Sequence, residues 1–126
     1  MVEGVEIRFK DVIEKANVTG DARFALKYAL DMLSTVLKIS VPESTIRYAE
    51  DRALKYVENK IDKHAITASL LEFLEVVLGD AFSPCTPPEW VEVGRKYGLY
   101  CLAIDQALNI IYAYDPNEDA LKVKNV

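Results

Sequence analysis

The fold depends on residues 86–114, TPPEWVEVGRKYGLYCLAIDQALNIIYAY. The first four residues predict a helix start, because Thr86 and Glu89 have capping-box spacing and the two prolines between them occupy the first helical positions. From Tyr97 onward, apolar residues recur at spacings of three and four, as on one side of a helix. The pattern therefore predicts a long, largely buried helix over about residues 87–114, at the centre of the protein.

Two glycines and one acid qualify this prediction. Gly94 and Gly98 each weaken a helix by about 1 kcal/mol relative to alanine, so they mark either a point where the element kinks or splits, or a side that a neighbouring helix approaches closely. The length of residues 97–114 is near the lower end of what crosses a bilayer. Asp105 lies near their centre, however, where a carboxylate costs about 2.5 to 3.5 kcal/mol. A buried helix of a soluble protein is the favoured interpretation.

The rest of the chain shows further helical patterns. A helix is predicted over residues 21–38, with Asp21 as its N-cap. A second is predicted over residues 42–61, with Ser40 and Glu43 at capping-box spacing around its start. A third is predicted over residues 63–78 and ends at Gly79. Residues 3–16 fit a helix better than the alternative, a strand over their first half. No internal repeat is evident. The 126 residues thus predict a single helical domain, a compact all-α bundle of four to five helices.

The charge and composition of the chain limit the kinds of partner that it is expected to bind. Asp and Glu outnumber Lys and Arg by 20 to 15, which argues against direct nucleic-acid binding by bulk electrostatics. The first ten residues lack the apolar core of a signal peptide, so the cytoplasm is the expected compartment and no membrane partner is expected. The chain has few His and Gln residues and many charged residues, a composition similar to that of heat-adapted proteins.

The two cysteines are expected to be free thiols. If one continuous helix separates Cys85 from Cys101, they lie roughly 24 Å apart, far beyond disulfide reach. Cys85 precedes the helix start, where a helix dipole lowers a thiol pKa. The alternative, that Cys85 packs against Trp90, is favoured because no neighbouring base would activate the thiol.

The sequence predicts no catalytic residue, cofactor or metal. His64 is the only histidine, and Glu72 with Glu75 is better explained as a solvated acidic strip than as part of a metal site. Hydrolase, nucleotide-binding and zinc-binding signatures are absent. Whether the protein is an enzyme stays open.

Three residues are candidates for a buried polar site. On a central helix, Asp105 would need a partner for its carboxylate, and Asn109 would lie one turn further along the same polar strip. With Cys101, these residues define the first alternative function, a small enzyme or ligand-binding bundle with a polar pocket.

The leading hypothesis is a non-catalytic helical interaction protein, forming a homodimer or binding another protein. It rests on four tyrosines in the deciding stretch, because tyrosine is enriched in interface cores. These interface candidates are Tyr97, Tyr100, Tyr112 and Tyr114. A third possibility, an accessory subunit of a nucleoprotein complex, would require Arg8, Lys10 and Arg23 on one face.

Overall fold

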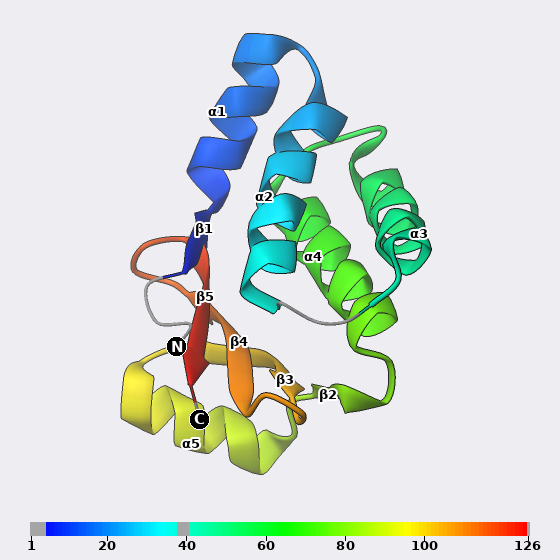
Figure 1. Ribbon diagram of the computed structural model, residues 1–126. Coiled ribbons are helices and arrows are strands. Elements are labelled where there is room, and N and C mark those ends of the chain that lie inside the picture. Colours follow the sequence, from blue (N-terminus) through cyan, green and yellow to red (C-terminus); the bar gives the residue numbers. More distant parts are fainter. Residues whose placement is uncertain (1–4, 38–40, 126) are drawn as a thin grey trace. The chain divides into compact units, whose positions relative to one another are not determined.

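The computed structural model describes residues 5–37 and 41–125, which fall into two compact units (Figure 1). The first unit comprises residues 1–8 and 80–126 and contains a β-sheet with one helix. The second comprises residues 9–79 and is helical. The prediction of an all-α bundle is therefore wrong, although it fits the second unit taken by itself.

Four helices form the second unit. They are α1 (Phe9–Thr19), α2 (Ala22–Leu37), α3 (Glu43–Leu54) and α4 (Lys63–Leu78), with a short 3-10 helix η1 (Lys55–Val57) after α3. Helix α1 packs against α2, and α3 packs against α4. Their facing apolar stripes form a core whose largest fully buried members include Leu26, Leu30, Leu33, Ile66, Leu70, Phe73 and Leu74.

The ends of these helices follow the sequence signals. The Asp21 carboxylate accepts a hydrogen bond from Phe24 N–H at 3.0 Å, and Asp62 accepts one from Ala65 N–H at 2.8 Å. Gly79 ends α4 with a φ of 57°, a conformation that glycine adopts without strain. Helix α3 with η1 ends at Val57, short of the expected residue 61. The proposed cap at Ser40 lies outside the described residues.

Both interpretations of residues 3–16 are partly correct. Strand β1 (Glu6–Arg8) takes the alternating part, and α1 begins directly after it at Phe9. The alternation of Ile7 with its charged neighbours therefore predicted the local structure better than a continuous helix did.

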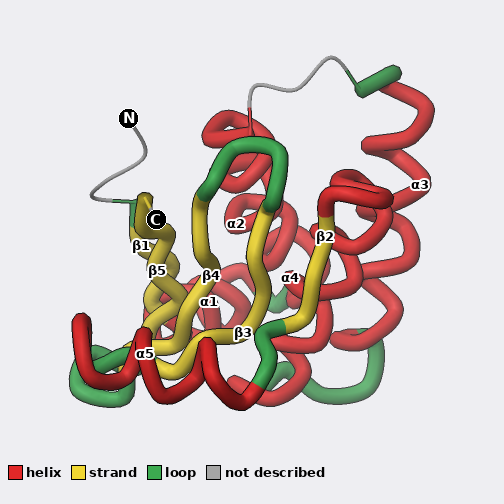
Figure 2. Tube along the Cα trace, turned by 90° about the horizontal axis from the view of Figure 1, so that it is seen from below, coloured by secondary structure: helices red, strands yellow, loops and turns green. Residues whose placement is uncertain are grey.

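The first unit contains a five-stranded antiparallel sheet in the order β1-β5-β4-β3-β2. The other strands are β2 (Phe82–Pro84), β3 (Tyr100–Asp105), β4 (Ile110–Asp115) and β5 (Ala120–Asn125), and a 3-10 helix η2 (Gly79–Ala81) leads into β2. Helix α5 (Pro87–Tyr97) lies across one face of this sheet (Figure 2). The edge strands β1 and β2 are only three residues long, and Pro84 further limits pairing at the β2 edge.

The long helix predicted over residues 87–114 is wrong beyond Tyr97. Its start is confirmed, since Thr86 and Glu89 form a capping box in which the Glu89 carboxylate accepts from Thr86 N–H at 2.6 Å. Gly98 then takes a left-handed conformation with φ 69° and ends α5, and the chain continues as β3 and β4. Residues 110–113 are buried on both sides of the sheet, so their apolar run carries no strand alternation that would distinguish it from a helix.

The two hairpins share a turn chemistry that repeats every ten residues. The Asp105 carboxylate accepts from the N–H groups of Ala107 and Leu108, and Asp115 accepts in the same way from Asn117 and Glu118. Four residues after each aspartate, Asn109 and Asp119 adopt positive φ angles of 54° and 53°. The short repeat D-x-x-x-(N/D) thus closes both four-residue loops, which corrects the expectation of no internal repeat.

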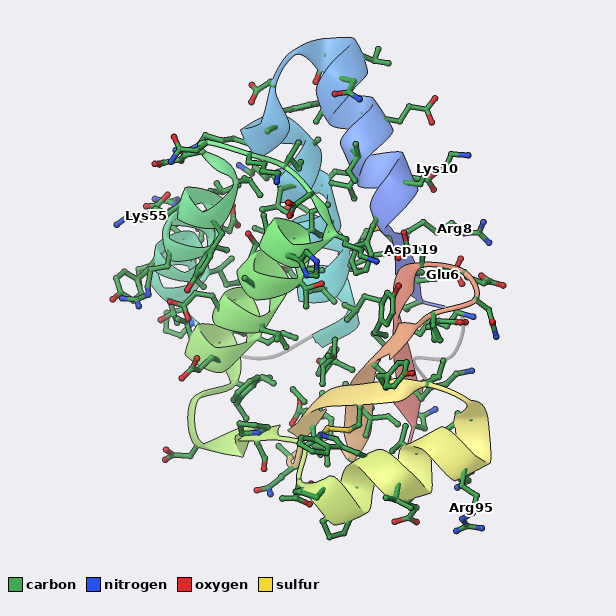
Figure 3. All side chains as sticks on the ribbon, turned by 180° about the vertical axis from the view of Figure 1, so that it is seen from behind. Glu6, Arg8, Lys10, Lys55, Arg95 and Asp119 are labelled. Carbon is green, nitrogen blue, oxygen red and sulfur yellow. A yellow bond between two sulfur atoms is a disulfide. The ribbon has the colours of Figure 1, made fainter. Side chains whose placement is uncertain are left out.

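Charged side chains connect β1 with β5 and the β4–β5 turn. Lys122 Nζ lies 2.8 Å from Asp115, 3.5 Å from Glu6 and 3.7 Å from Glu118. The Lys122 ammonium lowers the pKa of the Asp115 carboxyl, assisted by the backbone hydrogen bonds of the turn. Arg8 also contacts Glu6 and Glu118, and Figure 3 shows Glu6 and Arg8 together on β1. The network fixes the register of the short edge strand.

Candidate functional site: two grooves beside helix α5

Helix α5 is attached to the sheet by an apolar cluster and a disulfide bond. The cluster consists of the buried residues Cys85, Val93, Leu99, Cys101, Ile111 and Ala113, with Tyr97 and Ile104 packed against them. The disulfide joins Cys85, just before the helix, to Cys101 on β3 (Figure 3). The helix is therefore held to the sheet at both its start and its buried side.

The expectation of two free thiols is wrong. The Cα atoms of Cys85 and Cys101 lie 5.9 Å apart, because Gly98 reverses the chain and brings β3 back beside the residues that precede α5. The estimate of 24 Å assumed a continuous helix. Since Cys85 is in a disulfide, it is not a reactive thiol at the helix start.

An open groove of about 500 Å³, here called the aromatic groove, lies on one side of α5. The described residues that line it are apolar or small and include no charged side chain: Trp90, Val91, Gly94, Gly98, Leu99, Tyr100 and Pro116. Trp90, Val91 and Tyr100 project from it with exposed fractions of 52%, 70% and 63%. Exposed apolar side chains gathered on one face are typical of an interaction surface.

The two glycines leave this groove open. A methyl group built on Gly94 would meet only the carbonyl oxygen of Leu99, at 3.9 Å, which is ordinary contact. Gly98 lines the same groove and ends the helix. The expectation that the element splits at a glycine is confirmed at Gly98, where α5 ends. The alternative, that a neighbouring helix approaches both glycines closely, is wrong, because among the described residues nothing lies within 4 Å of a methyl group built on Gly98.

A second groove of about 240 Å³, here called the polar-edged groove, lies between α5 and the β3–β4 hairpin. Its floor is formed by Val93 and Ile111 of the apolar cluster and by Ile104, which packs against that cluster. Its edge carries ionisable and amide side chains from the helix and the turn: Glu89, Glu92, Lys96, Tyr97, Gln106 and Asn109.

The four tyrosines predicted for an interface occupy different environments. Tyr100 is exposed and stacks on Tyr114, with ring centroids 6.3 Å apart. Tyr97 is half-buried and donates to the carbonyl of Asn125 at 3.4 Å. Tyr112 is 0% exposed and is thus not accessible to a partner. Of the four, Tyr100 has the largest accessible surface for such a contact.

The structure does not bring Asp105, Asn109 and Cys101 into one pocket. Cys101 faces α5, whereas Asp105 pairs with Ile110 in the β3–β4 register and projects from the opposite face of the sheet. Asn109 lines the polar-edged groove, and neither Asp105 nor Cys101 lines it. The polar pocket predicted from these three residues is therefore not formed by them together.

The two carboxylate oxygens of Asp105 lie in different environments. Its Oδ1 holds the β3–β4 turn, while Oδ2 is buried and accepts no hydrogen bond within the part of the chain that the structure describes. The hydroxyl of Tyr112, on the same face of the sheet, is also buried and also has no hydrogen-bond partner among the described residues. Burial, together with the Asp105 carboxylate, raises the pKa of Tyr112 far above its ordinary value.

We expect Asp105→Asn to leave stability at pH 7 unchanged or higher. Asparagine keeps the carbonyl oxygen that caps the turn and removes a buried carboxylate oxygen that has no partner. Asp105→Ala, in contrast, loses both turn hydrogen bonds and should destabilise the protein by about 1 to 3 kcal/mol. Urea unfolding of the two variants tests this expectation. Equal losses would show that the second carboxylate oxygen is required, and would restore Asp105 as a ligand-binding candidate.

The remaining sequence candidates lie apart from these grooves. His64 is exposed, and Glu72 forms an ion pair with Arg52 at 2.7 Å. Across the described residues, no group of three or more His, Cys, Asp or Glu is placed to hold a metal ion. Arg8 and Arg23, suggested for a nucleoprotein interface, each contact glutamate side chains, Arg23 with Glu58 at 3.2 Å.

Sequence reasoning missed Trp90 and Val91 as surface residues. The sequence did carry a signal for them. The buried stripe of α5 runs through Val93 and Tyr97, so the apolar pair that follows Glu89 is not needed to pack the helix on the sheet. An additional Trp-Val pair in a short helix indicates a second contact surface.

Compared with known proteins, the chain matches no family model, no curated protein and no solved structure. In the described ranges 5–37 and 41–125, no helix combines the length and the apolarity needed to cross a bilayer.

Proposed function

We propose that the protein is a non-catalytic interaction protein that forms a homodimer through the aromatic groove. The observation that carries this proposal is the exposure of Trp90, Val91 and Tyr100 around a hollow left open by Gly94 and Gly98. Large aromatic side chains at the centre of an interface supply most of its binding free energy. Of the four tyrosines in the sequence hypothesis, only Tyr100 lines the proposed contact, which also includes Trp90.

A second copy of this chain suits the groove because the same face carries projecting side chains and a hollow. In a two-fold symmetric dimer, the same patch of both subunits meets itself, so Trp90 or Tyr100 of one copy can enter the hollow of the other. Charge is compatible with this arrangement. The chain carries a formal charge of −5, but no charged side chain of the described residues lines the groove, so these parts of two copies can meet there without placing like charges in contact.

The cytoplasm remains our proposal for the compartment. Disulfides are rare in the cytosol of most organisms, but intracellular proteins of hyperthermophiles are rich in them. A Cys85–Cys101 disulfide is thus consistent with the heat-adapted composition that the sequence indicated.

Analytical ultracentrifugation over a concentration series tests the homodimer. We expect reversible dimerisation and, for Trp90→Ala or Tyr100→Ala, a dissociation constant raised roughly 30-fold or more, as removal of a hot-spot residue gives. The matched control is Tyr28→Ala, which removes an equally exposed tyrosine from α2 in the other unit and should leave the dissociation constant unchanged.

Gly94→Ala separates dimerisation from damage to the fold. The methyl group fits the helix and should raise the melting temperature, because alanine stabilises a helix by about 1 kcal/mol relative to glycine. It also narrows the groove and should weaken the dimer. A wild-type protein that stays monomeric at millimolar concentration, or a Tyr28→Ala variant that dissociates as readily as Tyr100→Ala, would refute the proposal.

A further inference from the structure

The polar-edged groove has a rigid apolar floor. Val93 of α5 lies beside Ile104 of β3 and Ile111 of β4, within the cluster that contains the Cys85–Cys101 disulfide. Because the disulfide and the packed cluster fix the helix against the sheet, the floor exists before any ligand arrives. Preformed apolar floors with a few polar groups around them are the usual construction of small-molecule sites.

Opposite charges lie along one edge of this floor. Glu89, Glu92 and Lys96 line the groove from successive turns of α5, with the acids toward its start and the lysine toward its end. Glu89 uses one oxygen to cap the helix, whereas neither Glu92 nor Lys96 takes part in an ion pair within the described ranges. Instead, Lys96 Nζ lies over the ring of Tyr97, 5.2 Å from its centroid, beside the groove.

Amide side chains form the other edge. Gln106 and Asn109 both belong to the four-residue loop that Asp105 closes, and the positive φ of Asn109 is part of that loop's geometry. A carboxamide both donates and accepts hydrogen bonds, which matches the two polar groups of a peptide unit. The groove thus offers an apolar floor, an acid-to-base edge and a facing amide edge.

We propose that this groove binds a short apolar peptide of two or three residues with both ends free. Its ammonium group pairs with Glu92 and Glu89, its carboxylate pairs with Lys96, and its side chain lies on the apolar floor. The dimensions agree, since Glu89 and Lys96 are separated by about 10 Å along the helix axis and two to three extended residues span about 7 to 10 Å. At about 240 Å³ the groove is smaller than the sites that hold drug-sized ligands.

The test is a titration of the full-length, isotope-labelled protein with the tripeptide Ala-Leu-Ala, followed by NMR. We expect saturable shifts at Val93, Ile104 and Ile111 and at the side-chain amides of Gln106 and Asn109. The same peptide acetylated at its N-terminus or amidated at its C-terminus should bind roughly tenfold more weakly in each case, as loss of one charge-assisted contact gives.

Charge-matched variants assign the contact. Lys96→Gln should weaken binding of Ala-Leu-Ala about tenfold and abolish its preference over the amidated peptide. Arg95→Gln removes the same charge from a neighbouring position of α5 that lines neither groove, and should change nothing. Figure 3 shows Arg95 pointing away from the helix into solvent.

Three results would overturn the proposal: no saturable shift up to the solubility limit of the peptide, equal affinity for free and blocked peptides, or equal losses for Lys96→Gln and Arg95→Gln. None of them bears on the homodimer, because the aromatic groove shares no lining residue with the polar-edged groove. Conversely, a strictly monomeric protein leaves the peptide proposal intact.

Discussion

Removal of the Cys85–Cys101 disulfide is expected to lower the free energy of unfolding by about 3 kcal/mol, the loss predicted for a closed loop of about 15 residues. The two cysteines are 16 positions apart and enclose all of α5. Without the bond, the unfolded chain gains conformational freedom and the start of α5 is held only by packing. The double variant Cys85→Ala/Cys101→Ala, compared with the wild type by urea unfolding, measures the effect.

A reducing agent provides the matched control. A reductant strong enough to break the disulfide should bring the wild type close to the stability of the double variant, and it should leave the variant itself unchanged. Trp90 fluorescence is a suitable probe, because Trp90 is the only tryptophan and lies on α5. Two titratable thiols in the unreduced, denatured protein would contradict the expectation.

Phe73→Ala should have the larger effect, about 3 to 5 kcal/mol, because truncation of a fully buried phenylalanine loses its apolar contacts and leaves a cavity. Phe73 lies on α4 and is 0% exposed. Unfolding followed by circular dichroism, which reports helix content, measures this loss of stability. Val18→Ala on α1, where the side chain is exposed, is the control and should change stability by no more than about 0.5 kcal/mol.

The same variant tests the prediction of one domain. Phe73 belongs to the helical unit and Trp90 to the sheet unit. If the chain unfolds as one domain, Phe73→Ala must shift the Trp90 fluorescence transition as far as the circular dichroism transition. A fluorescence transition that stays in place while the helical signal shifts would show two domains.

The helical unit was largely predictable because its signals are local. The cap at Asp21, the terminating Gly79 and three-four apolar spacing each act within one or two turns of chain. They gave the extents of α2 and α4 almost to the residue. The capping box at Thr86 and Glu89 was correct for the same reason.

The sheet unit was predicted wrongly because its pairing is not local. Residues 110–113 are buried on both faces of the sheet, and a continuously apolar segment satisfies a helical pattern as well as a strand. The sequence did contain one signal of hairpins, the ten-residue spacing of Asp105 and Asp115. Each aspartate caps a tight turn, and a spacing of ten residues is the repeat of neither a helix nor a heptad. A helix over residues 87–114 would separate the two cysteines widely, which is why the sequence predicts free thiols and not the disulfide that the chain reversal at Gly98 permits.

By itself, the sequence determined the starts of α2, α4 and α5, the glycine that ends α4 and the acidic charge, because capping, glycine conformation and charge belong to single residues or to close neighbours in the chain. Only the tertiary structure decided which side of α5 is buried, that Cys85 meets Cys101, and that Trp90 and Tyr100 share one groove. These features depend on the chain reversal at Gly98 and on antiparallel pairing between segments, and their stabilisation comes from contacts between residues that are distant in sequence.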